Sequence, residues 1–235
     1  MRLDKLLAHA GYGTRRDVKE IIKNKRVKVN EKIESKVNFN INPEIDVVLV
    51  DDVLVNYSKF VYIMLNKPQG YLSATKDNYD PVVIDLIQGY DHYELFPIGR
   101  LDKNTEGLLL ITNDGEINHK LTSPNYNVPK KYFAHIKGRV TEEDIIAFEN
   151  GVVLDDGYET KPGYLKILSA NDVSMIELII TEGKFHQVKR MFKAVNKEVI
   201  YLKRIGMGAI RLDEQLELSE YRLLNDDELE YLKKL

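Results

Sequence analysis

The fold of this chain is organised around residues 99–115, which read GRLDKNTEGLLLITNDG. Leucine and isoleucine fill positions 108–111 without a break, a glycine precedes them, and Asn113-Asp114-Gly115 follows them. Four apolar residues are too few for an ordinary helix. The run therefore predicts a buried strand that leads into a turn.

Asp102 lies between two cations, Arg100 and Lys103, a few residues before this strand. A carboxylate flanked by fixed positive charge stays ionised, and the edge of a buried strand gives it a defined position. The same residues also suit a surface turn whose charges are solvated. The rest of the chain has to decide between these interpretations.

Composition indicates a globular protein with an uneven distribution of charge. The 235 residues are 43% hydrophobic and 30% charged, enough for one large domain or a small and a medium one. The net charge is -3, yet residues 1–36 carry eleven Lys/Arg against five Asp/Glu, and residues 182–204 carry seven against two. Acidic residues gather in 37–58 and 213–235. A surface polarised in this way favours a phosphate-backbone partner.

Several classes of site are excluded or disfavoured. The chain has no cysteine, which excludes disulfides, a thiolate nucleophile and Cys-ligated metal. Its five histidines form no i, i+4 pair, and it contains no Walker loop and no nucleophile elbow. Residues 1–4 lack the apolar core of a signal peptide, and no apolar run approaches membrane-spanning length. We expect a cytoplasmic monomer with no membrane partner.

The N-terminal part of the chain predicts a small basic module. An amphipathic helix is expected from Leu3 to Ala10, and Thr14 caps a second helix with Asp17 three residues on. Short strands are expected at 26–30 and 47–50. Charge alone also fits a solvated pair of helices. The cations that we expect to contact RNA are Arg2, Lys5, Arg15, Arg16, Lys19, Lys23, Arg26 and Lys28.

The order of residues in this module is more specific than its charge. The series RLDKLL, then GxGTRR, then IIxxxRVxVN resembles the RNA-binding domain first described in ribosomal protein S-four. The resemblance covers nearly all of residues 1–48. It implies that the second helix and the turn after it contact structured RNA. We expect an RNA-binding domain at 1–58 and a second, larger domain at 59–235.

The second domain predicts an α+β fold with a mostly antiparallel sheet, because strands dominate and helices are interspersed without βαβ regularity. The role of the acidic segment 213–235 is left open, and a solvated surface helix is one interpretation of it. The expected strands are 61–65, 71–75, 108–111, 131–137, 164–169, 174–181, 199–204 and 209–212. The expected helices are 83–87, 116–121, 141–150 and 189–195.

Three stretches of this domain could carry chemistry. The first contains Asp102. The second is Lys130-Lys131-Tyr132 at the head of a strand, where the tyrosine is either a packed edge aromatic or a catalytic group. The third is 182–192, EGKFHQVKRMF, which leaves a strand at a glycine and enters a basic helix. Polar side chains beside a helix N-terminus suit phosphate, although a solvated basic helix is the simpler interpretation.

Four motifs in this order resemble pseudouridine synthases of the RsuA/RluB/RluE/RluF branch, which carry an S-four-like N-terminal domain. They are KPxG at 67–70, GRLDxxTxGLL at 99–109, KxY at 130–132 and EGKxHQxKRM at 182–191. The resemblance spans almost the whole chain. It implies isomerisation of a uridine within RNA, without redox chemistry or an external group. No cofactor and no metal is expected.

The resemblance also implies roles for individual residues. Asp102 is the essential carboxylate, which attacks the sugar, attacks the base or removes a ribose proton. Lys184 is its basic partner, and Tyr132 lies against the uracil of a nucleotide that has left its stack. Leu202 or Ile205 forms an apolar floor. The remaining substrate contacts are expected from Arg100, Gln187, Lys189 and Arg190.

The expected partner is ribosomal RNA, as a small-subunit assembly intermediate. Glu106 and the series His186-Gln187-Val188-Lys189-Arg190 favour the small-subunit branch of the family. One alternative is a synthase acting on large-subunit ribosomal RNA. Another is a non-catalytic RNA-binding factor for ribosome assembly, in which Asp102 has no chemical role.

Overall fold

The computed structural model describes residues 1–235, which form two compact units. Unit 1 comprises Met1–Val61 and Gln88–Glu94, and unit 2 comprises Tyr62–Ile87 and Leu95–Leu235. The predicted division after residue 58 leaves the 88–94 segment in the second domain, whereas this segment packs with unit 1. No helix combines the length and the apolar character needed to cross a bilayer.

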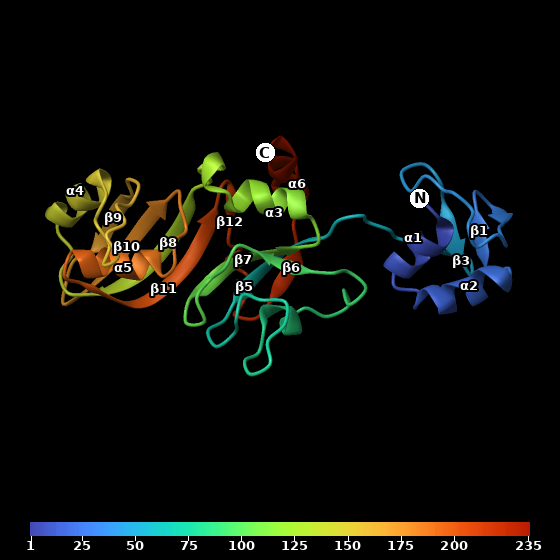
Figure 1. Ribbon diagram of the computed structural model, residues 1–235, viewed down its shortest axis with the longest axis horizontal. Helices are drawn as coiled ribbons and strands as arrows, with labels where there is room; N and C mark the ends of the chain where they lie inside the picture. Colours follow the sequence, from blue (N-terminus) through green and yellow to red (C-terminus); the bar gives the residue numbers. More distant parts are fainter. The chain divides into compact units, whose positions relative to one another are not determined.

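Unit 1 is built from two helices packed on a small antiparallel sheet with strand order β2-β1-β3-β4 (Figure 1). The capping box predicted at Thr14 is confirmed: its backbone N–H donates to Asp17 Oδ2 at 2.9 Å, and its Oγ1 accepts from the Asp17 N–H at 3.3 Å. The elements are α1 (Leu3–His9), α2 (Arg15–Lys23), β1 (Val27–Val29), β2 (Lys32–Ile33), β3 (Val48–Val50) and β4 (Val53–Leu54).

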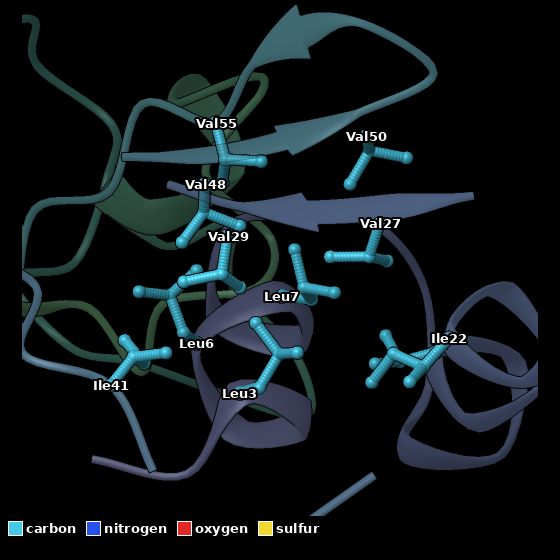
Figure 2. Close-up of a cluster of buried hydrophobic side chains, with 11 residues drawn as sticks. Leu3, Leu6, Leu7, Ile22, Val27, Val29, Ile41, Val48, Val50 and Val55 are labelled. Atoms are coloured by element: carbon cyan, nitrogen blue, oxygen red, sulfur yellow. The ribbon is translucent and has the colours of Figure 1, made fainter. Parts of the chain in front are cut away.

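The core of unit 1 lies between the helices and the sheet. Figure 2 shows leucines of α1, Ile22 of α2 and valines of β1 and β3 pointing toward one another. Leu3, Leu7 and Ile22 are fully buried. The apolar stripe of each helix therefore faces the sheet, and its lysines and arginines face solvent.

Unit 2 is an α+β domain around a nine-stranded sheet. Seven of the strands follow the order β13-β5-β7-β11-β8-β10-β9, and the other two, β6 and β12, pair with β7 and β11. The strands are β5 (Tyr62–Lys67), β6 (Phe96–Ile98), β7 (Glu106–Thr112), β8 (Lys130–Lys137), β9 (Tyr164–Ser169), β10 (Val173–Ile180), β11 (Glu198–Met207), β12 (Ile210–Arg211) and β13 (Tyr221–Leu223). The α-helices are α3 (Gly115–Thr122), α4 (Glu142–Asn150), α5 (Gln187–Ala194) and α6 (Asp226–Lys234), and the 3-10 helices are η1 (Val83–Leu86) and η2 (Pro124–Tyr126).

The predicted sheet is confirmed as mostly antiparallel. Its one parallel pairing joins β7 to β11, with Lys203 opposite Glu106 and Arg204 opposite Gly107. Gly107 has φ +99°, and a Cβ placed there would lie 2.2 Å from the Arg204 carbonyl oxygen. Only glycine allows the two strands to approach this closely. We call this parallel pairing the seam of the sheet.

Helices cover the sheet on either side of the seam. α4 packs against β9 and α5 against β11 (Figure 1). Residues of α3 and α6 share an apolar cluster with Met64 of β5 and Leu108 of β7. The run 108–111, predicted as a buried strand, is buried on both faces of the sheet.

One sequence-based expectation for unit 2 is wrong, and the structure answers one question that the sequence left open. Residues 71–75 form no strand, because Ser73 turns its hydroxyl to the backbone of Leu101 instead of entering a ladder. The acidic segment 213–235 is more than a solvated helix. Its β13 pairs with β5, and Leu232 of α6 is buried.

Candidate active site

A small pocket of about 60 Å³ opens beside the seam, where the loop before β7 meets β8, β11 and the turn from β10 into α5. Asp102 comes from the loop, Tyr132 from β8 and Leu202 from β11. The structure thus brings together residues from three sequence motifs that are far apart in the chain. The lining residues are Arg100, Leu101, Asp102, Thr105, Tyr132, Gly183, Lys184, His186, Gln187, Val188, Lys189 and Leu202.

Asp102 is held by side chains that are distant in sequence. Its Oδ2 accepts a 2.8 Å hydrogen bond from Lys189 Nζ, and His186 Nε2 lies 3.5 Å from its Oδ1. Lys189 Nζ also donates to Asn104 Oδ1 at 2.6 Å. The neighbouring Lys103 does not contribute, because its ammonium pairs with Asp80. The carboxylate is only 24% exposed, so this ion pair is partly shielded from solvent.

The loop that carries Asp102 is held from beneath by a buried lysine. Lys67, the last residue of β5, is fully buried, and its Nζ donates to the carbonyl oxygens of Pro68, Asp102, Lys103 and Thr105 at 2.9, 3.2, 3.4 and 3.0 Å. Burial lowers the pKa of Lys67 to about 8, against the attraction of the Asp102 carboxylate. Burial of the Lys67 ammonium therefore costs free energy, and its N–H groups fix the path of the Asp102 loop.

Lys184, the expected basic partner of Asp102, occupies a different position. It lines the pocket, but its Nζ lies 4.5 Å from the centroid of the Tyr158 ring, and the ion pair to Asp102 is made by Lys189. The physical reason is the turn before α5. His186 adopts a left-handed conformation with φ +48°, so the chain reverses and α5 presents Lys189 to the carboxylate.

The turn before α5 is fixed by a buried carboxylate that the sequence analysis did not single out. Glu182 accepts hydrogen bonds from the Tyr158 hydroxyl at 2.7 Å, from the Lys161 N–H at 3.0 Å and from Gln187 Nε2 at 2.5 Å. Gln187 Oε1 in turn accepts the Lys184 N–H at 2.8 Å. Gln187 is itself buried, so it positions the turn from within. The residue Glu182 begins the EGKxHQ motif, which is the signal that could have identified it.

The apolar side of the pocket is formed by Tyr132 and Leu202, which are both buried. Leu202 of β11 is paired with Ala134 of β8. Because Ala134 lies two residues after Tyr132 in β8, Tyr132 and Leu202 are on the same face of the sheet. Ile205, the alternative floor residue, is only partly buried and does not line the pocket.

Arg190 differs from its expected role as a phosphate contact. Its guanidinium is only 15% exposed and lies between Asp155 and Asp156, at 2.5 and 2.7 Å from their carboxylates. These two carboxylates raise the pKa of Arg190 and leave little of the guanidinium for a ligand. In contrast, Arg100 is exposed at the rim of the pocket.

The eight cations expected to contact RNA from unit 1 fall into two groups. Arg2, Arg26 and Lys28 pair with Asp4, Asp51 and Asp52. Lys23 lies 3.7 Å from Glu20. Of the eight, Lys5, Arg15, Arg16 and Lys19 are exposed and have no ion pair. Three of these four lie in α2, so this helix carries most of the unpaired cations among the eight.

Comparison with known proteins identifies both parts of the chain. Residues 61–194, which include Asp102, Tyr132 and Lys189, match the RNA pseudouridylate synthase family. The chain belongs to that family. This pseudouridine synthase is an isomerase, and its residues 1–47 match the S4 domain. The predicted resemblance is therefore confirmed in both parts.

Three relatives align with the synthase over nearly their full lengths. The uncharacterized RNA pseudouridine synthase YtzG of Bacillus subtilis is 48% identical, covering 100% of this chain and 99% of the relative. Ribosomal large subunit pseudouridine synthase B of B. subtilis is 39% identical, with 100% and 96% covered. Ribosomal small subunit pseudouridine synthase A of Salmonella typhimurium is 38% identical, with 97% and 98% covered.

A solved structure supports the fold of the synthase. A crystal structure of a pseudouridylate synthase, 36% identical to this chain, superimposes with a TM-score of 0.69 and covers 99% of both chains. The RsuA/RluB type of pseudouridine synthase therefore accounts for the whole chain.

Proposed function

We propose that this synthase converts a uridine of ribosomal RNA to pseudouridine in the cytoplasm, with Asp102 as the essential carboxylate. The observation that carries the proposal is the placement of an ion-paired, partly buried carboxylate in a pocket with a tyrosine and a leucine. Two of the relatives are named for ribosomal RNA, one for each subunit.

The reaction rearranges the nucleotide without adding or removing atoms. The bond from ribose C1′ to uracil N1 breaks, the uracil rotates, and a bond from C1′ to C5 forms. C5 then loses its proton, and N1 gains one. The target base has to leave its stack to reach the pocket.

The residues of the pocket supply three parts of this chemistry. Lys189 holds the Asp102 carboxylate in a fixed orientation, which attack on C1′, attack on the base and removal of a ribose proton all require. Leu202 provides an apolar surface against which the free uracil rotates. Tyr132 lies beside the base and assists loss of the C5 proton. Lys184 contacts the RNA backbone from the rim.

We propose that the target is small-subunit ribosomal RNA. The protein would bind it as a monomer, while the RNA is part of an assembly intermediate. Large-subunit RNA is the second candidate, because the large-subunit relative matches this chain as well as the small-subunit one does. The exposed cations at the start of α2 would hold the RNA while the base enters the pocket.

The experiment is a pseudouridine map of both ribosomal RNAs from cells that lack the protein. Complementation compares wild type, Asp102→Asn and Asp172→Asn, the last altering an exposed aspartate outside the pocket. Loss of one site, restored by wild type and Asp172→Asn but not by Asp102→Asn, is the expected result. Restoration by Asp102→Asn would contradict the role of this carboxylate. An unchanged map in both RNAs would favour a non-catalytic assembly factor.

A further inference from the structure

One large apolar side chain is exposed at the rim of the pocket. Phe185 is 76% exposed and lies between Lys184 and His186 in the turn before α5. One face of its ring stacks on His186, with 3.9 Å between centroids and 16° between planes. The opposite face is open. His186 in turn reaches Asp102 at 3.5 Å, so the two rings lead outward from the carboxylate.

A second hollow adjoins the catalytic pocket at this stack. Its volume is about 560 Å³, and it shares His186 and Lys189 with the pocket of Asp102. The two hollows therefore adjoin at His186 and Lys189. The lining residues are Asp155, Asp156, Phe185, His186, Lys189, Arg190 and Lys193.

The charges around the hollow are unequally available. Arg190 is occupied by Asp155 and Asp156, so its charge is neutralised within the wall. Lys193 is 77% exposed and only 3.9 Å from Asp155, a distance at the limit of an ion pair. The exposed ring of Phe185 and the available ammonium of Lys193 line the same hollow. Together they suit a nucleotide, whose base stacks on the ring and whose phosphate pairs with the ammonium.

We propose that Phe185 is a stacking platform for an unpaired base next to the target uridine, with the adjoining phosphate at Lys193. The proposal rests on the proposed function, because it places this base beside a uridine bound at Asp102. Stacking tolerates any base, so Phe185 selects an unpaired neighbour and not a particular sequence. RNA loops and bulges would be bound in preference to continuous helices.

Binding is tested with a tryptophan reporter. The chain has no tryptophan, so Phe185→Trp introduces a single indole at the platform. The control is Tyr164→Trp, at a 58% exposed position on β9. Both full-length variants are titrated with single-stranded oligouridylate and with a duplex RNA of the same length. Quenching of Phe185→Trp by the single strand, with little change in Tyr164→Trp or with the duplex, is the expected result.

Equal responses of the two variants would overturn the proposal, as would quenching by duplex and single strand alike. Absence of quenching by either RNA would overturn it too, and would point instead to a protein partner for the exposed ring.

Turnover gives the second test. Small- and large-subunit ribosomal RNA carry tritium at uridine C5, which the reaction releases, and each RNA is tested as a free transcript and as an assembly intermediate with ribosomal proteins. Loss of stacking in Phe185→Ala should raise KM about tenfold, with the loss in KM and not in kcat, and Phe185→Tyr should restore KM. A fall in kcat at unchanged KM would show that Phe185 merely positions His186. If wild type releases no tritium, the proposed function fails, and the fluorescence result alone decides whether Phe185 stacks a base.

Discussion

Replacement of Lys67 by methionine should separate the stability of this synthase from its activity. The three N–H groups of the ammonium are shared among four carbonyls, and at about 1.3 kcal/mol for each donor their removal costs about 4 kcal/mol. Burial also lowers the pKa of Lys67 from 10.5 to about 8, which corresponds to about 3 kcal/mol that the charged form costs the fold. Methionine fills a similar volume. Lys67→Met should therefore destabilise the protein by only about 1 kcal/mol near neutral pH.

The pH dependence has a defined sign. Because the folded pKa lies below the unfolded value, the unfolded chain binds this proton more tightly, and the stability of wild type rises with pH between the two values. The stability difference between wild type and Lys67→Met should widen by about 2 kcal/mol between about pH 7 and 9.5. Urea unfolding followed by circular dichroism measures this difference. Lys166→Met, at an exposed position on β9, is the control and should show no such widening.

Activity should respond more strongly than stability. Without Lys67 the Asp102 loop loses the donors that fix its path, and a displaced carboxylate should lower tritium release by about a hundredfold. Parallel pH profiles of stability for wild type and Lys67→Met, together with unchanged activity, would refute this role of Lys67.

Two further comparisons test the site and the seam. Lys189→Met should lower kcat by about a hundredfold because Asp102 loses its ion pair, and Lys189→Arg should retain most activity. Lys184→Met should instead act mainly on KM. Equal kcat in Lys189→Met and wild type would contradict the pairing of Lys189 with Asp102. Gly107→Ala should destabilise the fold by about 3 kcal/mol or more, because the added Cβ meets the backbone of β11, whereas Gly157→Ala, also at positive φ but in open space, should cost about 1 kcal/mol. Urea midpoints measure both glycine variants, and similar values for the two would show that the close approach at the seam is not limiting.

Local sequence signals were sufficient for most elements of the fold. The uninterrupted run 108–111 identified the central strand because only a strand buried on both faces requires four consecutive apolar residues. The capping residue Thr14, with Asp17 three residues on, marked the start of α2. These signals act over a few residues, so they do not depend on the rest of the fold.

The pairing of charges could not be predicted in this way. Lys184 and Lys189 lie on opposite sides of a left-handed residue, and only the resulting turn determines which ammonium meets Asp102. Lys67 ends an apolar strand, a position that is usually solvated, and its burial depends on closure of a loop 35 residues later. Gathering of the motifs in one region was foreseeable, whereas the contacts within it arise from tertiary structure.

The seam also determines when the active site can form while the protein is being synthesised. Lys189 meets Asp102 across 87 residues of chain, and Arg204 Nε donates to the Leu108 carbonyl across 96. Contacts between residues so far apart in the chain form late in folding, because closing a long loop costs entropy before the contacts can stabilise it. A nascent chain that ends before β11 has the S4 domain and the Asp102 loop but lacks the strand that joins the two halves of the sheet. RNA binding should therefore precede RNA modification as the chain emerges from the ribosome.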